Sequence, residues 1–246
     1  MKERRFEGIT KKIGAKPFII LIMVLIFLIP VSFIKSLVRD RSYYYKDAVS
    51  TILQPKGGEP HLEGLLLAIP YTSKTETTDN QGKTSIEEKT NYIITVPESY
   101  NLQTTVKPEY LSRGIFEVPV FNCSVLVQGD FTPIEYVHYN IDEKTIDWQN
   151  AMLLLGVSNK KSFTQTPLVQ VDNKNLTMSL LSPSNSSPFT NPIFYDLPKN
   201  FLKDGFSYTI NIELQGGKAL HITPLATNNS FSVSSSWATP GFTGGW

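Results

Sequence analysis

The hydrophobic pattern of the chain changes once, near residue 60. The first part holds one long apolar run, Pro17 to Ile34, with no charged residue in its 18 positions. At 1.5 Å rise per residue, a helix of this length covers about 27 Å, close to the roughly 30 Å thickness of a bilayer's hydrocarbon core. Lys16 and Lys35 flank the run and can extend their ammonium groups to the headgroups. The run therefore predicts a membrane-spanning helix.

Two other interpretations of this run, a buried core helix and a cleaved signal peptide, fit the residues less well. A core helix keeps a polar stripe toward solvent, and this run has none. A signal peptide has an apolar region of about 7–15 residues followed by a small-residue cleavage site. The residues from Val31 to Ser36 contain no Ala-x-Ala pattern. We therefore expect an uncleaved anchor.

A helical repeat continues beyond the anchor. Its positions are Ile34, Leu37, Val38, Arg41, Tyr45, Ala48 and Ile52. We expect this helix to end near Leu53, because Pro55 and Gly57-Gly58 follow. The triplet Tyr43–Tyr45 fits two arrangements: an aromatic belt at the headgroup level, or a stalk that packs its tyrosines on the domain beyond.

From Gly64 onward the period changes from 3.6 to 2, which is typical of strands. The segment Ser207–Leu214 alternates strictly between apolar and polar residues. Gln215–Lys218 then predicts a tight turn, and Ala219–Leu225 is predicted to return as the partner strand. A further alternating strand is predicted from Phe231 to Trp237.

Earlier segments predict more strands. Gly64–Pro70 and Lys89–Pro97 predict a long hairpin on either side of the polar tip Thr77–Gly82. The other predicted strands are Leu102–Lys107, Gly114–Val120, Ser124–Phe131, Ala151–Val157, Leu168–Val171 and Leu176–Leu181. About ten or eleven short strands predict a mainly β fold, an antiparallel sandwich or open barrel-like domain, preceded by one N-terminal transmembrane helix.

These elements divide the chain into four parts. We expect a basic head at residues 1–16, a transmembrane anchor at 17–38, a juxtamembrane helix and linker at 39–60, and an extracytoplasmic β domain at 61–246. The low-complexity stretch Ser182–Pro192 is interpreted as a surface loop within that one domain.

The net charge of +1 averages over unlike segments. Residues 1–16 carry six basic and two acidic side chains, whereas 14 basic and 19 acidic residues follow from Ser42 to the end. The basic head predicts a cytoplasmic N-terminus, with the residues beyond about 36 on the far side of the membrane, which in a bacterial cell is periplasmic or external. Arg113 is the only arginine after Ser42, so the composition excludes nucleic-acid binding by this part.

The search for catalytic and metal-binding patterns predicts none. His61, His138 and His221 lack metal-ligand spacing, and the single Cys123 is interpreted as a buried small hydrophobe. Ser158 and Lys161 match the S-x-x-K spacing of serine–lysine acyl enzymes, but the other elements of that family are missing. We therefore assign no catalytic, cofactor-binding or metal residue, and expect no enzyme and no cofactor.

A group of carboxylates beside an aromatic residue needs a separate interpretation. Asp142-Glu143 and Asp147 lie near Trp148 and could suggest a cation or sugar site. They lack the spacing of a calcium loop, so we interpret them as solvated charges in a turn.

Four strings, in this order, carry a family resemblance. They are Leu65–Tyr71, Val96–Ser99, Arg113–Val120 and Ser234–Phe242. Together with the N-terminal membrane helix, the chain resembles the CreD family of bacterial inner-membrane proteins. The resemblance implies a periplasmic domain, a role in cell-envelope integrity under a two-component envelope response, and an association with colicin tolerance. It supplies no catalytic or cofactor residues.

Members of that family typically continue past the S-x-W-x-x-P-x-F region into several further membrane helices. The present chain ends at Trp246. The resemblance therefore implies that it is the anchor and β domain of a longer design, truncated before those helices.

Three functional hypotheses follow. The first is a membrane-anchored, non-enzymatic envelope protein whose β domain packs on or binds another envelope component, either an envelope protein or the missing C-terminal membrane helices. Its other partner is the lipid bilayer, through residues 17–38. The second is a ligand-binding sensor module, which a large, partly apolar pocket would favour. The third is an envelope-acting hydrolase, which would need a cleft with convergent acid, base or nucleophilic groups.

Overall fold

The computed structural model describes most of the chain in two compact units, Met1–Val49 and Ser50–Trp246. The described residues are 15–78, 84–134, 136, 141–179, 187–198, 201–202 and 204–244. The predicted polar tip Thr77–Gly82 and His138 lie wholly or partly outside them.

The described part of the first unit is residues 15–49 of the helix α1 (Ala15–Leu53), and the last four residues of the helix belong to the second unit. The helix is long and apolar enough to cross a membrane, and the side chains of its most apolar part are exposed. Pro30 lies inside it without ending it. The helix ends where the N–H groups of Lys56 and Gly58 donate to the carbonyl of Leu53, and Gly57 and Gly58 adopt positive φ. The predicted end near Leu53 is confirmed.

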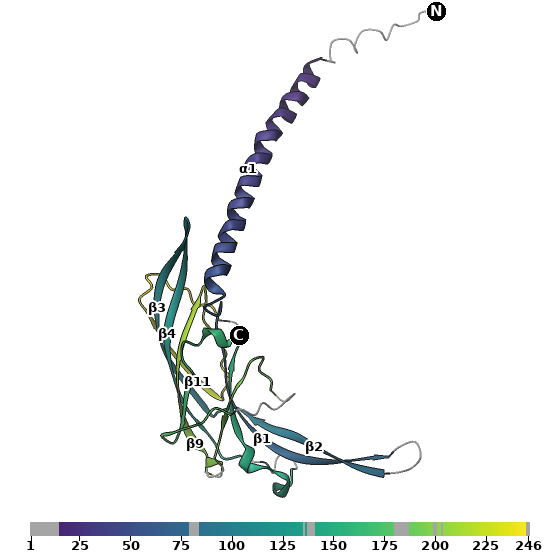
Figure 1. Cartoon of the computed structure of the whole chain (residues 1–246), viewed down its shortest axis with the longest axis vertical. Helices are drawn as coiled ribbons and strands as arrows, with labels where there is room; N and C mark the ends of the chain where they lie inside the picture. The colour runs from purple at the N-terminus through teal and green to yellow at the C-terminus, as the bar shows by residue number, and fades with distance from the viewer. Residues whose placement is uncertain are drawn as a thin grey trace, which may run out of the picture. The chain divides into compact units, whose positions relative to one another are not determined.

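The second unit contains two sheets. Sheet A is formed by β1 (His61–Thr78), β2 (Thr84–Thr95), β5 (Met152–Val157), β8 (Ile193–Asp196) and β10 (His221–Ile222). Its order is β10-β1-β5-β8, and β2 pairs with the far part of β1. Figure 1 shows β1 and β2 extending together away from the rest of the unit as a two-stranded arm.

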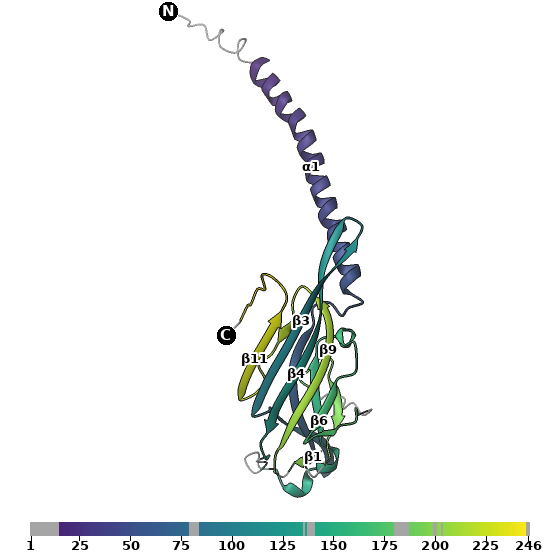
Figure 2. The same ribbon diagram turned by 90° about the vertical axis from the view of Figure 1, so that its left-hand side faces the viewer.

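Sheet B is the larger of the two, and Figure 2 shows its strands side by side. It is formed by β3 (Ser99–Arg113), β4 (Phe116–Phe131), β6 (Leu168–Val171), β7 (Lys174–Asn175), β9 (Phe206–Gly217) and β11 (Asn228–Ser235). Its order is β11-β3-β4-β9-β6-β7. Three single-turn 3₁₀ helices, η2 (Glu143–Thr145), η3 (Trp148–Asn150) and η4 (Lys160–Ser162), lie in the connections of the same unit.

The main core lies between the facing sides of the two sheets. Leu65, Leu67 and Ile69 of β1 belong to one buried cluster with residues of sheet B, including Val127 and Ile210. Alternation in β3, β4 and β9 places every second side chain in this cluster. The predicted sandwich is confirmed, as a mixed one, because β11 and β10 pair in parallel with β3 and β1.

Sheet A is buried on both faces near its centre. Leu66, Ala68 and Leu154 form a second cluster on the face away from sheet B, where Phe189 and Leu225 cover them. A strand buried on both sides needs apolar residues at consecutive positions. This explains why Leu65–Ile69 and Met152–Leu155 are continuous apolar runs.

The predicted partner of β9 is wrong. Ala219–Leu225 does not return beside β9: within it only β10 is a strand, and β10 pairs with β1 in the other sheet. The N–H of His221 donates to Pro60 O, and that of Thr223 to Leu62 O. Gln215–Gly217 continues β9 instead of forming a hairpin turn.

Three other strand predictions differ from the structure. Gly114–Val120 and Ser124–Phe131 are parts of one strand, β4, which pairs with β3 without a break. Leu176–Leu181 is not a strand in its described residues, where only Met178 forms an isolated bridge to Tyr195. The short edge strand β8 was not predicted at all.

The apparent break in β4 has a packing cause. Val118 and Val120 are buried on the face of sheet B that points away from sheet A, whereas Phe121 and Cys123 belong to the core between the sheets. A Cβ placed on Gly217, the neighbour of Val120 in β9, would meet the side chain of Leu53. The buried face therefore changes where Leu53 covers this end of the sheet, although the strand itself continues.

Candidate functional site

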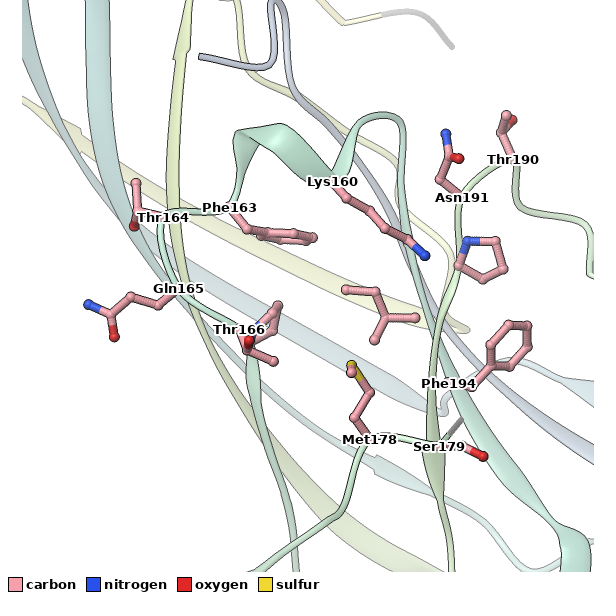
Figure 3. Close-up of a pocket in the computed structure, with 13 residues that line it drawn as sticks. Lys160, Phe163, Thr164, Gln165, Thr166, Met178, Ser179, Thr190, Asn191 and Phe194 are labelled. Atoms are coloured by element: carbon pink, nitrogen blue, oxygen red, sulfur yellow. The ribbon is translucent and has the colours of Figure 1, made fainter. Parts of the chain in front are cut away.

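A cavity of about 700 Å³ opens at the side of the sandwich, where the edge strand β8 lies near the segment that leads into β6. Its residues come from four separate segments: η4, Phe163–Pro167, Met178–Ser179 and Thr190–Phe194. Figure 3 shows the side chains of Lys160, Phe163 and Met178 pointing from different sides toward the same space.

Backbone hydrogen bonds hold these segments in place. The N–H of Thr164 donates to Glu213 O of β9 at 2.9 Å, and that of Ser179 donates to Phe194 O of β8 at 2.8 Å. The Asn191 side chain donates to Ser158 O at 2.7 Å. The walls of the cavity are thus tied to both sheets, so its shape is fixed by the sandwich.

The lining suits binding better than catalysis. Pro167, Ile193 and Phe194 are buried and give the cavity an apolar floor. Lys160 is the one ionisable side chain among the described lining residues; the other polar groups are hydroxyls and amides. General acid–base chemistry needs a proton donor and acceptor whose pKa values lie near the working pH. The described lining offers no such pair.

Two of the three histidines lie close together, which spacing along the sequence did not indicate. His61 and His221 are opposite each other in the parallel pairing of β1 and β10, with ring centroids 5.8 Å apart. His61 Nε2 lies 2.7 Å from Thr223 Oγ1, and His221 Nε2 lies 3.8 Å from Glu59 Oε2. Lys218 also pairs with Glu59 at 2.9 Å, and its hydrogen bond lowers the pKa of Glu59 below the usual value. No group of three metal-ligating side chains occurs among the described residues.

The S-x-x-K match has a structural explanation. The Oγ of Ser158 accepts a hydrogen bond from the His61 N–H at 3.1 Å, which ties the end of β5 to β1. Asn159 caps η4 by accepting from the N–H of Lys161. Within the described part of the chain no hydrogen bond joins the Ser158 hydroxyl to the Lys161 amine, so the pair is not arranged as nucleophile and base.

Two of the three carboxylates near Trp148 cap turns, and the third, Glu143, lies in the first position of η2. Asp142 Oδ1 accepts from the Lys144 N–H at the start of η2, and Asp147 Oδ1 accepts from the Gln149 N–H at the start of η3. Their interpretation as turn residues is confirmed.

Cys123 is buried, as the sequence predicts. Burial raises the pKa of its thiol to about 12. A thiol with so high a pKa holds almost no thiolate at neutral pH, so Cys123 is a packing residue.

A second candidate site is the edge of sheet B. β11 is the last strand in the sheet, and all eight of its residues are exposed. Phe231 and Val233 lie beside Leu102 and Thr104 of β3, on the face that forms the core elsewhere, yet each is about two-fifths exposed (42% and 41%). The outer edge of β11 therefore presents backbone hydrogen-bonding groups together with apolar side chains.

Comparison with known proteins decides the family. The family model described as Inner membrane protein CreD matches residues 12–246. The chain belongs to the CreD family. The Inner membrane protein CreD of Escherichia coli (strain K12) is 24% identical over 246 residues, which are 99% of this chain and 52% of that protein. The chain thus spans about half the length of the curated relative that it matches. No solved structure matches the chain.

Family membership and the apolar helix α1 together identify an inner-membrane protein. The resemblance inferred from the four strings is confirmed. Two of them, Leu65–Tyr71 and Arg113–Val120, lie largely in the strands β1 and β4, so part of the family signal is the pattern of the β domain.

Proposed function

We propose that this CreD-family chain is a non-enzymatic envelope protein whose β domain lies in the periplasm and binds another envelope component. The observation that carries the proposal is the outer edge of β11, which pairs with no further strand in the part of the chain that the structure describes. This edge belongs to a domain that α1 tethers to the membrane, so a partner in the envelope meets it at high effective concentration.

The edge of β11 lacks the features that normally protect a sheet edge. Edge strands are commonly blunted by lysines, prolines, bulges or very short length. β11 has eight residues without a charge or a proline, and pairs with β3 without a bulge. An extended segment of another protein can add to such an edge through main-chain hydrogen bonds, while its side chains contact Phe231 and Val233.

The orientation of the domain rests on the basic residues of the head. Residues 1–16 have a net charge of +4, because two glutamates, Glu3 and Glu7, offset the six basic residues Lys2, Arg4, Arg5, Lys11, Lys12 and Lys16. Such an excess favours retention of the N-terminus in the cytoplasm. A reporter that is active only outside the cytoplasm, fused to the C-terminus, is expected to be active; a purely cytoplasmic signal would contradict this orientation.

Photo-crosslinking in living cells tests the binding proposal. A photoreactive residue replaces Val233 in β11, and the same residue replaces Ile86 in β2 as the matched control, since Ile86 is also an exposed apolar side chain on a strand. We expect a discrete adduct with an envelope protein from position 233 and none from position 86. Equal adduct patterns at the two positions, or no adduct at 233, would overturn the proposal.

The cavity near Lys160 supports a second candidate function, a ligand-binding sensor. Its volume of about 700 Å³ falls within the range of small-molecule sites. One ammonium above an apolar floor matches an amphipathic anion, such as a medium-chain carboxylate. Decanoate at a hundred times its Kd would stabilise the folded chain by about 2.7 kcal/mol.

The matched variants for the cavity are Lys160→Ala and Lys161→Ala. Lys160 lines the cavity, whereas its neighbour Lys161 does not. Loss of the decanoate-induced rise in Tm in the first variant alone would favour the sensor. The uncharged alcohol decanol is the reference ligand. If decanoate raises the Tm of the wild-type chain no more than decanol does, the cavity is not a site for an amphipathic anion and this candidate is removed.

A further inference from the structure

The face of sheet B that points away from sheet A carries three rows of polar side chains at its centre, between a row that contains Asp130 and a row that contains Lys107. In register across β11, β3, β4 and β9, the rows are Ser230-Asn101-Gln128-Thr209, Ser232-Gln103-Leu126-Asn211 and Ser234-Thr105-Ser124-Glu213. We call these twelve residues the polar face. Strand spacing of about 4.8 Å places them on a regular grid, and Figure 2 shows the four strands from this side.

The polar face is open and almost without charge. Ten of its members are exposed, and Leu126 and Thr209 are half-buried. Glu213 is the one ionisable member, and its carboxylate accepts a hydrogen bond from the Ser124 hydroxyl at 2.9 Å. A hollow of about 300 Å³ lies over the rows that contain Gln103, Ser124 and Asn211.

Four carboxamides on this face have no side-chain partner among the described residues: Asn101, Gln103, Gln128 and Asn211. Other amides of the unit are occupied, for example Gln170, which donates to Asn175 at 2.8 Å. A carboxamide offers two N–H donors and one carbonyl acceptor. The face therefore presents a grid of unused donors and acceptors beside the hydroxyls of β11.

We propose that the polar face binds a neutral polyhydroxylated chain, namely a glycan strand of the envelope. Sugar hydroxyls and N-acetyl groups both donate and accept hydrogen bonds, as carboxamides do. Leu126, at the centre of the middle row, provides an apolar contact for the C–H groups of a sugar ring. A phosphate-bearing polymer needs Lys or Arg, and none lies among these twelve residues; Lys107, in the next row along β3, is the nearest cation in register with them, so the centre of the face favours a neutral ligand.

This inference rests on the proposed periplasmic placement of the β domain but not on binding at the β11 edge. The outer edge of β11 is the proposed protein site, whereas the carboxamides lie on β3, β4 and β9. The two sites can therefore be tested separately.

The experiment is co-sedimentation of the full chain, in detergent, with purified peptidoglycan sacculi. We expect binding that soluble N-acetylglucosamine oligomers compete away. The double variant Gln103→Ala/Asn211→Ala removes two unpaired carboxamides and is expected to weaken binding about tenfold, since each hydrogen bond contributes about 0.5–1.5 kcal/mol. The matched control Gln54→Ala/Gln149→Ala also removes two exposed carboxamides, but away from this face.

Salt dependence separates hydrogen bonding from nonspecific adsorption. Binding through a neutral face is expected to change less than about twofold between roughly 50 and 500 mM salt, whereas adsorption through charges falls steeply. A second pair, Asn101→Ala/Gln128→Ala, repeats the test on the neighbouring row. The proposal is overturned if the wild type does not sediment, if salt abolishes sedimentation, or if the variants bind like the control. Photo-crosslinking from position 233 tests the protein site at the β11 edge, and its result does not depend on whether the polar face binds a glycan.

Discussion

Two exposed β surfaces of the second unit differ in their chemistry. The arm formed by the outer parts of β1 and β2 is rich in ionisable residues, including Lys74, Glu76, Glu87, Glu88 and Lys89. The polar face of sheet B has a single carboxylate among twelve residues. Both surfaces are solvated. Charged side chains on an edge strand keep it from pairing with another chain, and of the two surfaces only the arm has many of them.

The difference indicates where binding is expected. The free edge of β2 is protected by charge, and Lys74 pairs across the arm with Glu88 at 3.0 Å. β11 has no such protection, and the carboxamides of Asn101 and Gln103 in the neighbouring strand β3 have no side-chain partner among the residues that the structure describes. A sheet face that needed only solubility could be as charged as the arm. The scarcity of charge in β11 and in the twelve residues of the polar face is therefore the property that links the proposed edge and the proposed glycan site.

The largest effect is expected where β1 passes through the sandwich. Leu67 is fully buried there, whereas Ile86 in the arm is 64% exposed. Leu67→Ala removes buried methyl groups and leaves a cavity, which costs about 2–5 kcal/mol. Ile86→Ala is expected to change the free energy of unfolding by less than about 0.5 kcal/mol. Urea unfolding of the full chain in detergent measures both; similar losses would show that the arm is part of the cooperative core.

The next largest loss of stability is expected from a substitution at Gly129, where β4 lies very close to β3. A Cβ on Gly129 would lie 1.9 Å from Ser99 O and 2.6 Å from Tyr208 Oη. Gly129→Ala must push these strands apart and is expected to cost about 1–3 kcal/mol. Gly241→Ala is the control, because its Cβ would meet no atom within 4 Å. A shift in the urea midpoint for Gly241→Ala but not for Gly129→Ala would contradict the packing described for sheet B.

A smaller effect is expected from the Tyr208 hydroxyl, which donates to Ser99 O at 2.9 Å. Tyr208→Phe is expected to cost about 1 kcal/mol. Burial also raises the pKa of Tyr208 above the ordinary tyrosine value. The unfolded state then releases this proton at lower pH than the folded state, so stability is present below about pH 10 and falls as the pH rises further.

The alkaline loss of stability is expected to shrink in Tyr208→Phe. Tyr92→Phe in β2 is the control, since Tyr92 packs half-buried against the second cluster and its hydroxyl has no hydrogen bond within the described part of the chain. Denaturation midpoints measured from about pH 8 to pH 11 decide the point. If the denaturation midpoint of Tyr208→Phe falls with pH as steeply as that of the wild type, Tyr208 is not a source of the alkaline loss of stability.

The smallest effect is expected at Glu59, whose carboxylate pairs with Lys218 and His221 on an exposed surface. The hydrogen bond from Lys218 lowers the pKa of Glu59, so the stabilisation is present above the ordinary glutamate pKa and disappears as the pH falls through the lowered value. Glu59→Gln is expected to cost no more than about 0.5 kcal/mol at neutral pH. A loss above about 2 kcal/mol would mean that this exposed cluster stabilises the β1–β10 pairing far more than its solvation suggests.

Much of the architecture follows from local patterns. The charge-free run and the glycines after Leu53 predict α1 with its correct end, and strict alternation predicts β9 between Ser207 and Leu214. Those signals lie within a few residues of what they specify. The pairing of β10 with β1 brings His221 beside His61 across 160 positions, and no local signal encodes it.

The candidate sites were harder to predict for the same reason. The cavity at Lys160 combines four loops and strand ends that have no common motif, and the short strand β8 forms only because β5 provides its partner. The polar face could have been anticipated from the uncharged Ser, Asn and Gln positions of β3, β4 and β11. Doing so requires the register of four strands, which only the structure supplies.

The central claim is that sheet B, with its neutral face and open edge, is presented to the periplasm. The most direct test is labelling of Ser232→Cys with a membrane-impermeant maleimide in intact spheroplasts. Native Cys123 serves as an internal control because it is only 2% exposed and burial raises its pKa to about 12. We predict rapid labelling at position 232 before lysis and none at Cys123 until the protein is denatured. Labelling of position 232 only after the inner membrane is opened would contradict the account.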